Sequence, residues 1–273
     1  MFRTCLENVR EMMPLIHNIT NYVTVNDVAN ALLACGGSPI MADDEADVED
    51  ITTICGGLNI NIGTLNARTI PSMFLAGRKA RELGHVIVLD PVGAGASRMR
   101  TETAISLMKE LRPHAIRGNI SEIKTLMGWG GSTKGVDADL ADAVTEENLS
   151  SVIARAKQFA EEIKSIIVIT GALDLVCNAS RCYVIRNGRP EMSRITGTGC
   201  QLSAIVTAYL TANQENDLEA AAAAVSLMGL AGEIGWSQMQ EWDGNATYRN
   251  RIIDAIDQMN GDMLEKGADY EVC

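Results

Sequence analysis

The chain has 273 residues, of which 47% are hydrophobic, so it is long enough to bury a full core. Its formal net charge of -12 argues against the dense basic surface that nucleic-acid binding requires, and favours a small-molecule substrate. Seven scattered cysteines, without a CxxC pair or a zinc-ligand spacing, are typical of a reducing, cytoplasmic protein.

The sequence shows no internal division and no membrane-spanning segment. No repeat and no linker rich in Pro, Gly or Ser interrupts it, which predicts a single domain over residues 1–273. Charged residues recur in a helical pattern over residues 1–14, so this segment lacks the apolar core of a signal peptide. The longest apolar stretch, 220–232, is too short to span a bilayer and predicts a closely packed, buried helix.

Short β-branched runs alternate with longer helical patterns, which is typical of βαβ units around a mostly parallel sheet. The expected strands are 38–42, 58–62, 86–90, 115–117 and 166–170. The expected helices are about 24–35, 66–83, 101–111, 121–127, 148–163, 200–213 and 218–240. Two further strands, 175–178 and 182–185, are expected to be antiparallel, because Asn187-Gly188 is a strong hairpin-turn signal. The sequence therefore predicts an α/β fold.

The first candidate site segment is the apolar run 86–90, which ends in Asp90 and continues as Pro-Val-Gly-Ala-Gly. Ligands of parallel sheets bind beyond the carboxyl ends of strands, and an acid there can hold magnesium. The alternative is that Asp90 only caps the following turn. The run 93–98 resembles a dinucleotide fingerprint, but Arg98 replaces its third glycine and no acidic strand end follows, which counts against a dehydrogenase.

The second segment is Arg117-Gly-Asn-Ile-Ser-Glu122, at the end of another expected strand. Asn119 and Glu122 are three residues apart at a helix start, so both side chains can face a hydrated magnesium ion between phosphates. Arg117 would neutralise nucleotide phosphates. The alternative is an ordinary capping box with no ligand. Since no Walker A sequence occurs, a kinase would need another phosphate-binding turn.

The third segment, 195–202, is a turn of Gly and Thr that runs into a helix near Cys200. Backbone N–H groups and the helix dipole converge at such a turn, so Thr198 and Gly199 would form an anion hole. A glycine-rich helix start without a ligand is the alternative. Cys200 lies where a helix lowers the pKa of a thiol, although a single cysteine is more often buried packing.

Taken together, Asp90-Pro-Val-Gly-Ala-Gly, Arg117-Gly-Asn-x-x-Glu122, Ile169-Thr-Gly171 and Thr196-Gly-Thr-Gly-Cys200 resemble the motifs of ribokinase-like kinases in order and spacing. The segments 17–33, 37–44 and 61–65, and Lys134-Gly-Val-Asp-Ala, are similar to hydroxyethylthiazole kinases. The resemblance covers about residues 14–212. It implies a ribokinase-like fold, with a central, mostly parallel sheet flanked by helices on both faces.

The resemblance also implies the activity. It is the ATP-dependent phosphorylation of the primary alcohol of 4-methyl-5-(2-hydroxyethyl)thiazole, in thiamine salvage. The family forms homotrimers with the substrate site between subunits. The roles that the resemblance implies are thiazole binding for Met41, Gly197, Asn21 and Val23, ATP binding for Arg117 and Thr170, and magnesium binding for Asp90 and Glu122.

Two departures leave roles open. Cys200 occupies the position at which most of the superfamily has an aspartate base, as is usual in the thiazole kinases, so it is the candidate catalytic residue but the base is not settled. The segment 244–248 matches the family's Gly-Pro-Gly-Ser-Phe motif only loosely, and no contact is assigned to it.

Three alternatives to a kinase remain. The first is a nucleotide-dependent NAD(P)H-hydrate dehydratase of the same fold, and the second is a non-catalytic thiazole or nucleotide-binding module. A cysteine hydrolase is the weakest, because none of the three histidines has an acid arranged to orient it. His17 in particular is expected to be a structural hydrogen-bonding residue.

Overall fold

The computed structural model describes residues 1–128 and 143–273. In these residues one sheet of nine strands runs in the order β2-β1-β3-β4-β5-β6-β7-β8-β9. Neighbouring strands from β2 to β6 are parallel, and those from β6 to β9 are antiparallel. The strands are β1 (Leu15–Ile19), β2 (Ser38–Met41), β3 (Gly57–Asn61), β4 (Val86–Asp90), β5 (Ala115–Asn119), β6 (Ile166–Thr170), β7 (Asp174–Cys177), β8 (Cys182–Ile185) and β9 (Tyr270–Val272).

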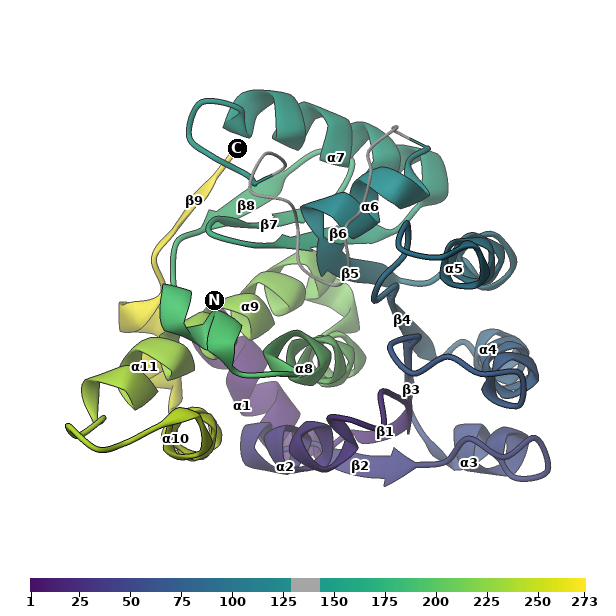
Figure 1. The fold of residues 1–273 in the computed structure, drawn as a ribbon, viewed down its shortest axis with the longest axis horizontal. Coiled ribbons are helices and arrows are strands. Elements are labelled where there is room, and N and C mark those ends of the chain that lie inside the picture. Colours follow the sequence, from purple (N-terminus) through teal and green to yellow (C-terminus); the bar gives the residue numbers. More distant parts are fainter. Residues whose placement is uncertain (129–142) are drawn as a thin grey trace.

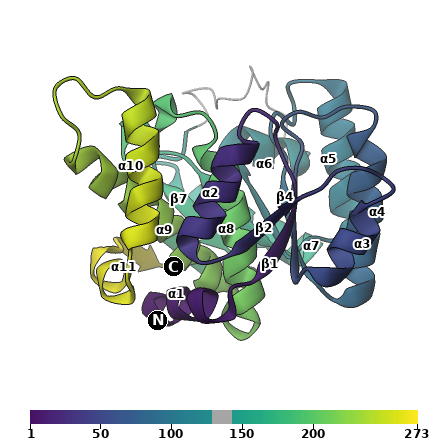
Figure 2. The same cartoon turned by 90° about the horizontal axis from the view of Figure 1, so that it is seen from below.

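Helices cover both faces of the sheet (Figure 1). The first face packs against α1 (Phe2–Met12), α2 (Val25–Cys35), α8 (Thr198–Ala212), α9 (Asp217–Ser237), α10 (Asn245–Gln258) and α11 (Gly261–Gly267). The second packs against α3 (Val48–Ile54), α4 (Thr69–Leu83), α5 (Arg98–Leu111), α6 (Ile120–Leu126) and α7 (Leu149–Ile163). Figure 2 shows α2 and α8 on one side of β1 and β2, and α3 and α4 on the other. The expected α/β architecture, a mostly parallel sheet flanked by helices on both faces, is confirmed.

Helix α8 lies close against the sheet because its inner side is made of small and hydroxyl side chains. Ser203, Thr207 and Thr211 recur every four residues and therefore share one helix face. A Cβ atom at Gly57 of β3 would lie 2.5 Å from Thr211 Oγ1 and 3.0 Å from Thr207 Cγ2, so a larger residue there would force α8 side chains to move. The close packing brings the N-terminus of α8 to the carboxyl ends of β3 and β4.

The sequence-based expectation did not include β1, α3 and β9, and it gave no bounds for α10 and α11. Strand β1 was not predicted because its buried residues include His17 and Asn18, which interrupt the apolar run. The His17 ring lies 2.9 Å from both Thr52 Oγ1 and the Ala42 carbonyl oxygen, which is the structural role expected for it. The segment Lys134–Ala138, which is similar in sequence to the hydroxyethylthiazole kinases, lies outside the described residues.

The hairpin prediction was correct for pairing and wrong for the turn. Strands β7 and β8 are antiparallel, but they are joined by 178–181, where Asn178 Oδ1 accepts hydrogen bonds from the following backbone. Gly188 instead donates its N–H to Glu233 of α9. The same hairpin joins Cys177 and Cys182 in a disulfide, a pair that the scattered spacing did not indicate.

The apolar stretch 220–232 lies in α9, as expected. Within the described residues, the segment Gln214–Ser237 is the one helix long and apolar enough to cross a membrane. However, 89% of its most apolar window is buried inside the protein. It is therefore a core helix of this fold.

Candidate functional site

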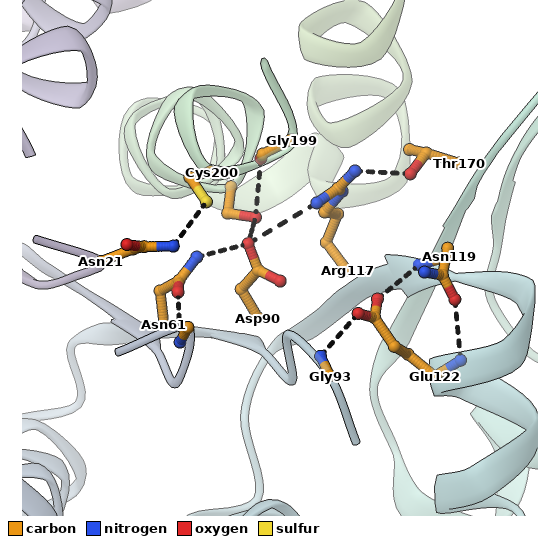
Figure 3. Close-up of polar contacts among 12 residues, drawn as sticks. Asn21, Asn61, Asp90, Gly93, Arg117, Asn119, Glu122, Thr170, Gly199 and Cys200 are labelled. Carbon is orange, nitrogen blue, oxygen red and sulfur yellow. Dashed lines mark hydrogen bonds and ion pairs between the residues drawn. The ribbon is translucent and has the colours of Figure 1, made fainter. Parts of the chain in front are cut away.

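Most of the candidate residues gather where β3, β4, β5 and β6 end and α8 begins (Figure 3). Asp90 is the last residue of β4 and lies opposite Asn61, the last residue of β3. In the same way, Asn119 of β5 lies opposite Thr170 of β6. Parallel strands in register therefore bring their terminal polar residues to one edge of the sheet.

Asp90 is fully buried and is held through one of its two oxygens. Its Oδ2 accepts hydrogen bonds of 2.7 Å from Asn61 Nδ2 and from Ser203 Oγ. Arg117 Nη1 lies 3.6 Å from the same oxygen. Burial raises the pKa of Asp90, against the opposing influence of Arg117 and the two hydrogen bonds. The other oxygen, Oδ1, is buried without a hydrogen-bond partner among the described residues. Such an oxygen suits a cation or its bound water.

Glu122 forms the capping box that the sequence offered as an alternative to a ligand site. Its Oε2 accepts from the backbone N–H of Asn119 at 2.8 Å, and Asn119 Oδ1 accepts from that of Glu122 at 2.9 Å. Its Oε1 accepts from the Gly93 N–H at 2.8 Å. Burial first, and then the charge of Asp90, raise the pKa of Glu122 to about 7. Each carboxylate oxygen keeps a second lone pair, so capping does not prevent metal contact.

These two carboxylates fit a magnesium site of a particular kind. They are buried near enough for the charge of Asp90 to raise the pKa of Glu122, so a cation between them would relieve a repulsion. In the described part of the chain, no group of three or more His, Cys, Asp or Glu side chains could hold a metal. A magnesium ion here would therefore keep several water ligands and depend on substrate phosphates, as it commonly does.

Arg117 connects β5, β6 and α8. Its Nη2 donates to Thr170 Oγ1 at 2.5 Å. A Cβ atom at Gly199 would lie 2.6 Å from Arg117 Nη2 and 2.8 Å from its Cζ, so the guanidinium rests directly against the first turn of α8. The Nε of Arg117 is buried and has no partner among the described residues. A cation with free hydrogen-bonding capacity thus lies beside a helix N-terminus.

The turn before α8 depends on Gly197. Its φ of 90° is left-handed, and a Cβ atom there would lie 2.8 Å from Thr24 Cβ. No side chain caps the first turn of α8, so the N–H groups of Thr198, Gly199 and Cys200 lack a capping acceptor. The structure therefore leaves uncapped N–H groups at the turn where the sequence predicts an anion hole.

Cys200 does not have the lowered pKa that its place in the first turn predicted. Its thiol is buried, and burial followed by the charge of Asp90 raises its pKa. Hydrogen bonding to Thr24 and the charge of Arg117 oppose this influence without overcoming it. Desolvation therefore outweighs the helix N-terminus, and the fold favours the thiol over the thiolate.

The four expected thiazole contacts are placed differently from one another. Asn21 Nδ2 lies 3.9 Å from Cys200 Sγ, and Asn21 Oδ1 accepts from the Val23 N–H at 2.9 Å. The side chain of Val23 is 69% exposed, and Met41 is a partly buried residue packed against the α8-side core. Asn21 and Gly197 thus adjoin Cys200, and Val23 is joined to Asn21 through its backbone N–H, whereas Met41 packs against the apolar core.

Sequence reasoning missed Asn61 and Ser203, which hold Asp90. A signal for Ser203 was present, because it lies four residues after Gly199 and so shares its helix face. Asn61 stood at a strand end, but only the register of β3 with β4 pairs it with Asp90. A separate cavity of about 460 Å³, lined by Val86, His114, Lys164 and Ile166 among others, opens near the amino ends of β4 and β6 and contains none of the candidate residues.

Comparison with known proteins identifies relatives over the whole chain. The family model described as the hydroxyethylthiazole kinase family matches residues 6–262. A hydroxyethylthiazole kinase of Clostridium acetobutylicum is 56% identical over 99% of both chains. A solved structure of a hydroxyethylthiazole kinase protein from Pyrococcus horikoshii is 32% identical, with a TM-score of 0.88 over 100% of this chain and 98% of that one.

A more distant structure supports the fold alone. It is a pyridoxal kinase from Staphylococcus aureus in complex with AMP-PCP and pyridoxal, 17% identical, with a TM-score of 0.64. The alignment covers 96% of this chain and 99% of that one.

Proposed function

The chain belongs to the hydroxyethylthiazole kinase family, and we propose how its own residues perform the reaction of that family. The protein is a kinase that phosphorylates the primary alcohol of 4-methyl-5-(2-hydroxyethyl)thiazole in thiamine salvage, with ATP as co-substrate. The observation that supports the proposed site is the contact of the Arg117 guanidinium with Gly199. It joins a cation and uncapped helix N–H groups in one anion site, directly beside the buried carboxylate of Asp90.

Phosphoryl transfer to an alcohol is catalysed mainly by positioning and by electrostatic stabilisation. Arg117, fixed by Thr170, would bind ATP phosphates, and the N–H groups of Thr198 and Gly199 would stabilise charge on the transferring group. Asn21, Gly197, Met41 and Val23 would bind the thiazole. Magnesium, held by Asp90 and Glu122 with retained waters, would neutralise phosphate charge.

The test of the function is product analysis with a panel of alcohols. We expect ADP to form with the thiazole alcohol and much less with hydroxymethylpyrimidine or pyridoxal, and mass spectrometry to find the thiazole phosphate. Conversion of a hydrated nicotinamide cofactor without alcohol phosphorylation would identify the dehydratase instead. ADP formation that is indifferent to every alcohol would reject the assignment.

The Cys200→Ala variant should remain a measurable kinase. General-base help is worth roughly 10²–10⁴ in rate, and the alcohol proton leaves late in a loose transition state. Because burial raises the pKa of Cys200, we expect a loss of kcat near or below about 100-fold. The measurement is kcat in a coupled ADP assay, with Cys200→Ser as the matched variant that keeps a proton-bearing group. An inactive alanine variant beside an active serine variant would instead make this side chain the proton acceptor.

We propose that the protein is a cytoplasmic, single-domain homotrimer whose thiazole site lies between subunits. The exposed apolar residues Tyr22, Val23, Leu33 and Ile54 support this assembly, because all four lie in or beside the segments at the β2 edge of the sheet. A ligand that binds across a subunit interface stabilises the assembled form.

Thiazole affinity and trimer content should therefore rise together with protein concentration. Sedimentation velocity and fluorescence titration across a dilution series would measure both. Val23→Lys should weaken both, whereas Met99→Lys, at another exposed apolar residue on α5, should weaken neither. Equal thiazole affinity in monomer and trimer would exclude the shared site.

A further inference from the structure

Arg100, in the first turn of α5, binds backbone carbonyls from two loops at the site. Its Nη1 donates to the carbonyl oxygens of Ile62 at 3.1 Å and Val92 at 2.8 Å, and its Nη2 donates to that of Gly63 at 2.7 Å. The first and third carbonyls follow β3, and the second follows β4. In the described part of the chain, Arg100 makes no ion pair with an acid. Its guanidinium is therefore committed to these two loops.

Two of the three carbonyls belong to the peptide groups that hold the site. The Ile62 carbonyl and the Gly63 N–H form one planar unit, and the Val92 carbonyl and the Gly93 N–H form another. The Gly63 N–H donates to Asn61 Oδ1 at 2.8 Å, and Asn61 Nδ2 donates to Asp90 Oδ2 at 2.7 Å. Nη1 of Arg100 thus binds the peptide whose N–H orients the Asn61 side chain toward Asp90.

The second peptide acts on the other carboxylate. The Gly93 N–H donates to Glu122 Oε1 at 2.8 Å, on the far side of the same plane whose carbonyl Arg100 binds. A hydrogen bond accepted by a carbonyl polarises its peptide and strengthens the bond that its N–H donates. One guanidinium nitrogen therefore binds both the peptide that holds Glu122 and the peptide that holds Asp90 through Asn61.

We propose that Arg100 is a positioning residue that sets the geometry of both carboxylates and thereby the affinity of the site for a divalent cation. The inference depends on the proposed function, because it takes Asp90 and Glu122 as the magnesium-binding pair. Arg100 acts through these peptides, since its guanidinium donates to the three carbonyl oxygens. Lysine cannot replace it fully, since a single ammonium lacks the planar fork that reaches three carbonyl oxygens.

The test compares Arg100→Gln and Arg100→Lys with Arg98→Gln. Arg98 lies in the same turn of α5, is 86% exposed at its side chain, and pairs with Glu102 on the surface. Calorimetry would measure the affinity of a non-hydrolysable ATP analogue with and without magnesium, and thermal melting would confirm folding. We expect the magnesium needed for half-saturation to rise roughly 10–100-fold in Arg100→Gln, less in Arg100→Lys, and not at all in Arg98→Gln.

Two results would overturn the inference. One is an unchanged magnesium requirement in folded Arg100→Gln, or in Arg100→Lys if the glutamine variant does not fold. The other is an equal loss of nucleotide affinity with and without magnesium, which would mean that Arg100 stabilises the two loops without a specific effect on the cation site. Asp90→Asn in the same titration distinguishes a failure of the role of Arg100 from a failure of the proposed metal-binding pair. If it weakens magnesium binding and the Arg100 variants do not, only the role of Arg100 fails; if Asp90→Asn has no effect, the metal pair itself is wrong.

Discussion

Gly199→Val should abolish kinase turnover while the protein still folds and binds the thiazole. The first side-chain atom of any other residue would lie 2.6 Å from Arg117 Nη2 and 2.8 Å from its Cζ. The guanidinium must then leave the first turn of α8, which separates the cation from the uncapped N–H groups. Loss of one oxyanion donor alone costs about 10²–10³ in kcat, and this substitution disturbs a donor set and a charge together.

The control is Gly244→Val, because a Cβ atom at Gly244 meets nothing within 4 Å and its φ of −118° is open to any residue. The measurements are kcat, thiazole affinity and the melting temperature of both variants. The kcat of Gly199→Ala should lie between those of the wild type and Gly199→Val, because the methyl group of alanine already contacts Arg117. Near wild-type kcat in folded Gly199→Val would show that the anion site of Arg117 and the first turn of α8 does not carry the reaction.

The candidate residues that the structure brings together are those whose location follows from their position along the chain. Asp90, Arg117 and Thr170 are at or near strand ends, and parallel strands place such residues at one edge whatever the order of the strands. Gly197 and Gly199 lie in a turn that opens a helix. Chain order and periodicity were sufficient to predict where these residues lie, and the roles of Thr170 and Gly197 came from the family resemblance.

The sequence could not supply what depends on tertiary contact. Asn61 acts on Asp90 through the register of β3 with β4, and Arg100 reaches loops up to 38 residues away in the chain. The pKa of Cys200 was predicted in the wrong direction, because local helix position favours the thiolate but packing removes the water that would stabilise it. Burial is a property of the whole fold and has no local signature in the sequence.

The same contrast applies to the carboxylates. The capping box around Glu122 was readable from the Asn119-x-x-Glu122 spacing, and it is present. Its third contact, from the Gly93 N–H, joins segments 29 residues apart and was not readable. That contact turns a common helix start into part of a site, since it fixes the second oxygen of the carboxylate.

Asp90→Asn should lose magnesium-dependent turnover without losing stability. The carboxamide oxygen can still accept from Asn61 and Ser203, while its NH₂ group replaces the free Oδ1 and removes the charge. Loss of a metal's charge stabilisation amounts to several kcal/mol, or roughly 10²–10³ in kcat. Burial raises the pKa of Asp90 even with Arg117 nearby, so the fold disfavours its charged form and the neutral amide should not lower the melting temperature.

The decisive comparison for Asp90→Asn is therefore between function and stability, measured as kcat across a magnesium titration and as the melting temperature. The matched control is Glu219→Gln, which neutralises another buried carboxylate, on α9 and paired with Arg181. That variant should lose stability, because Arg181 loses its partner, and should keep its magnesium dependence. Asp90→Asn should behave in the opposite way, with turnover lost and the fold retained, because the role of Asp90 is in the reaction and not in stability. A destabilised Asp90→Asn with normal magnesium dependence would instead make Asp90 a structural residue and move the metal elsewhere.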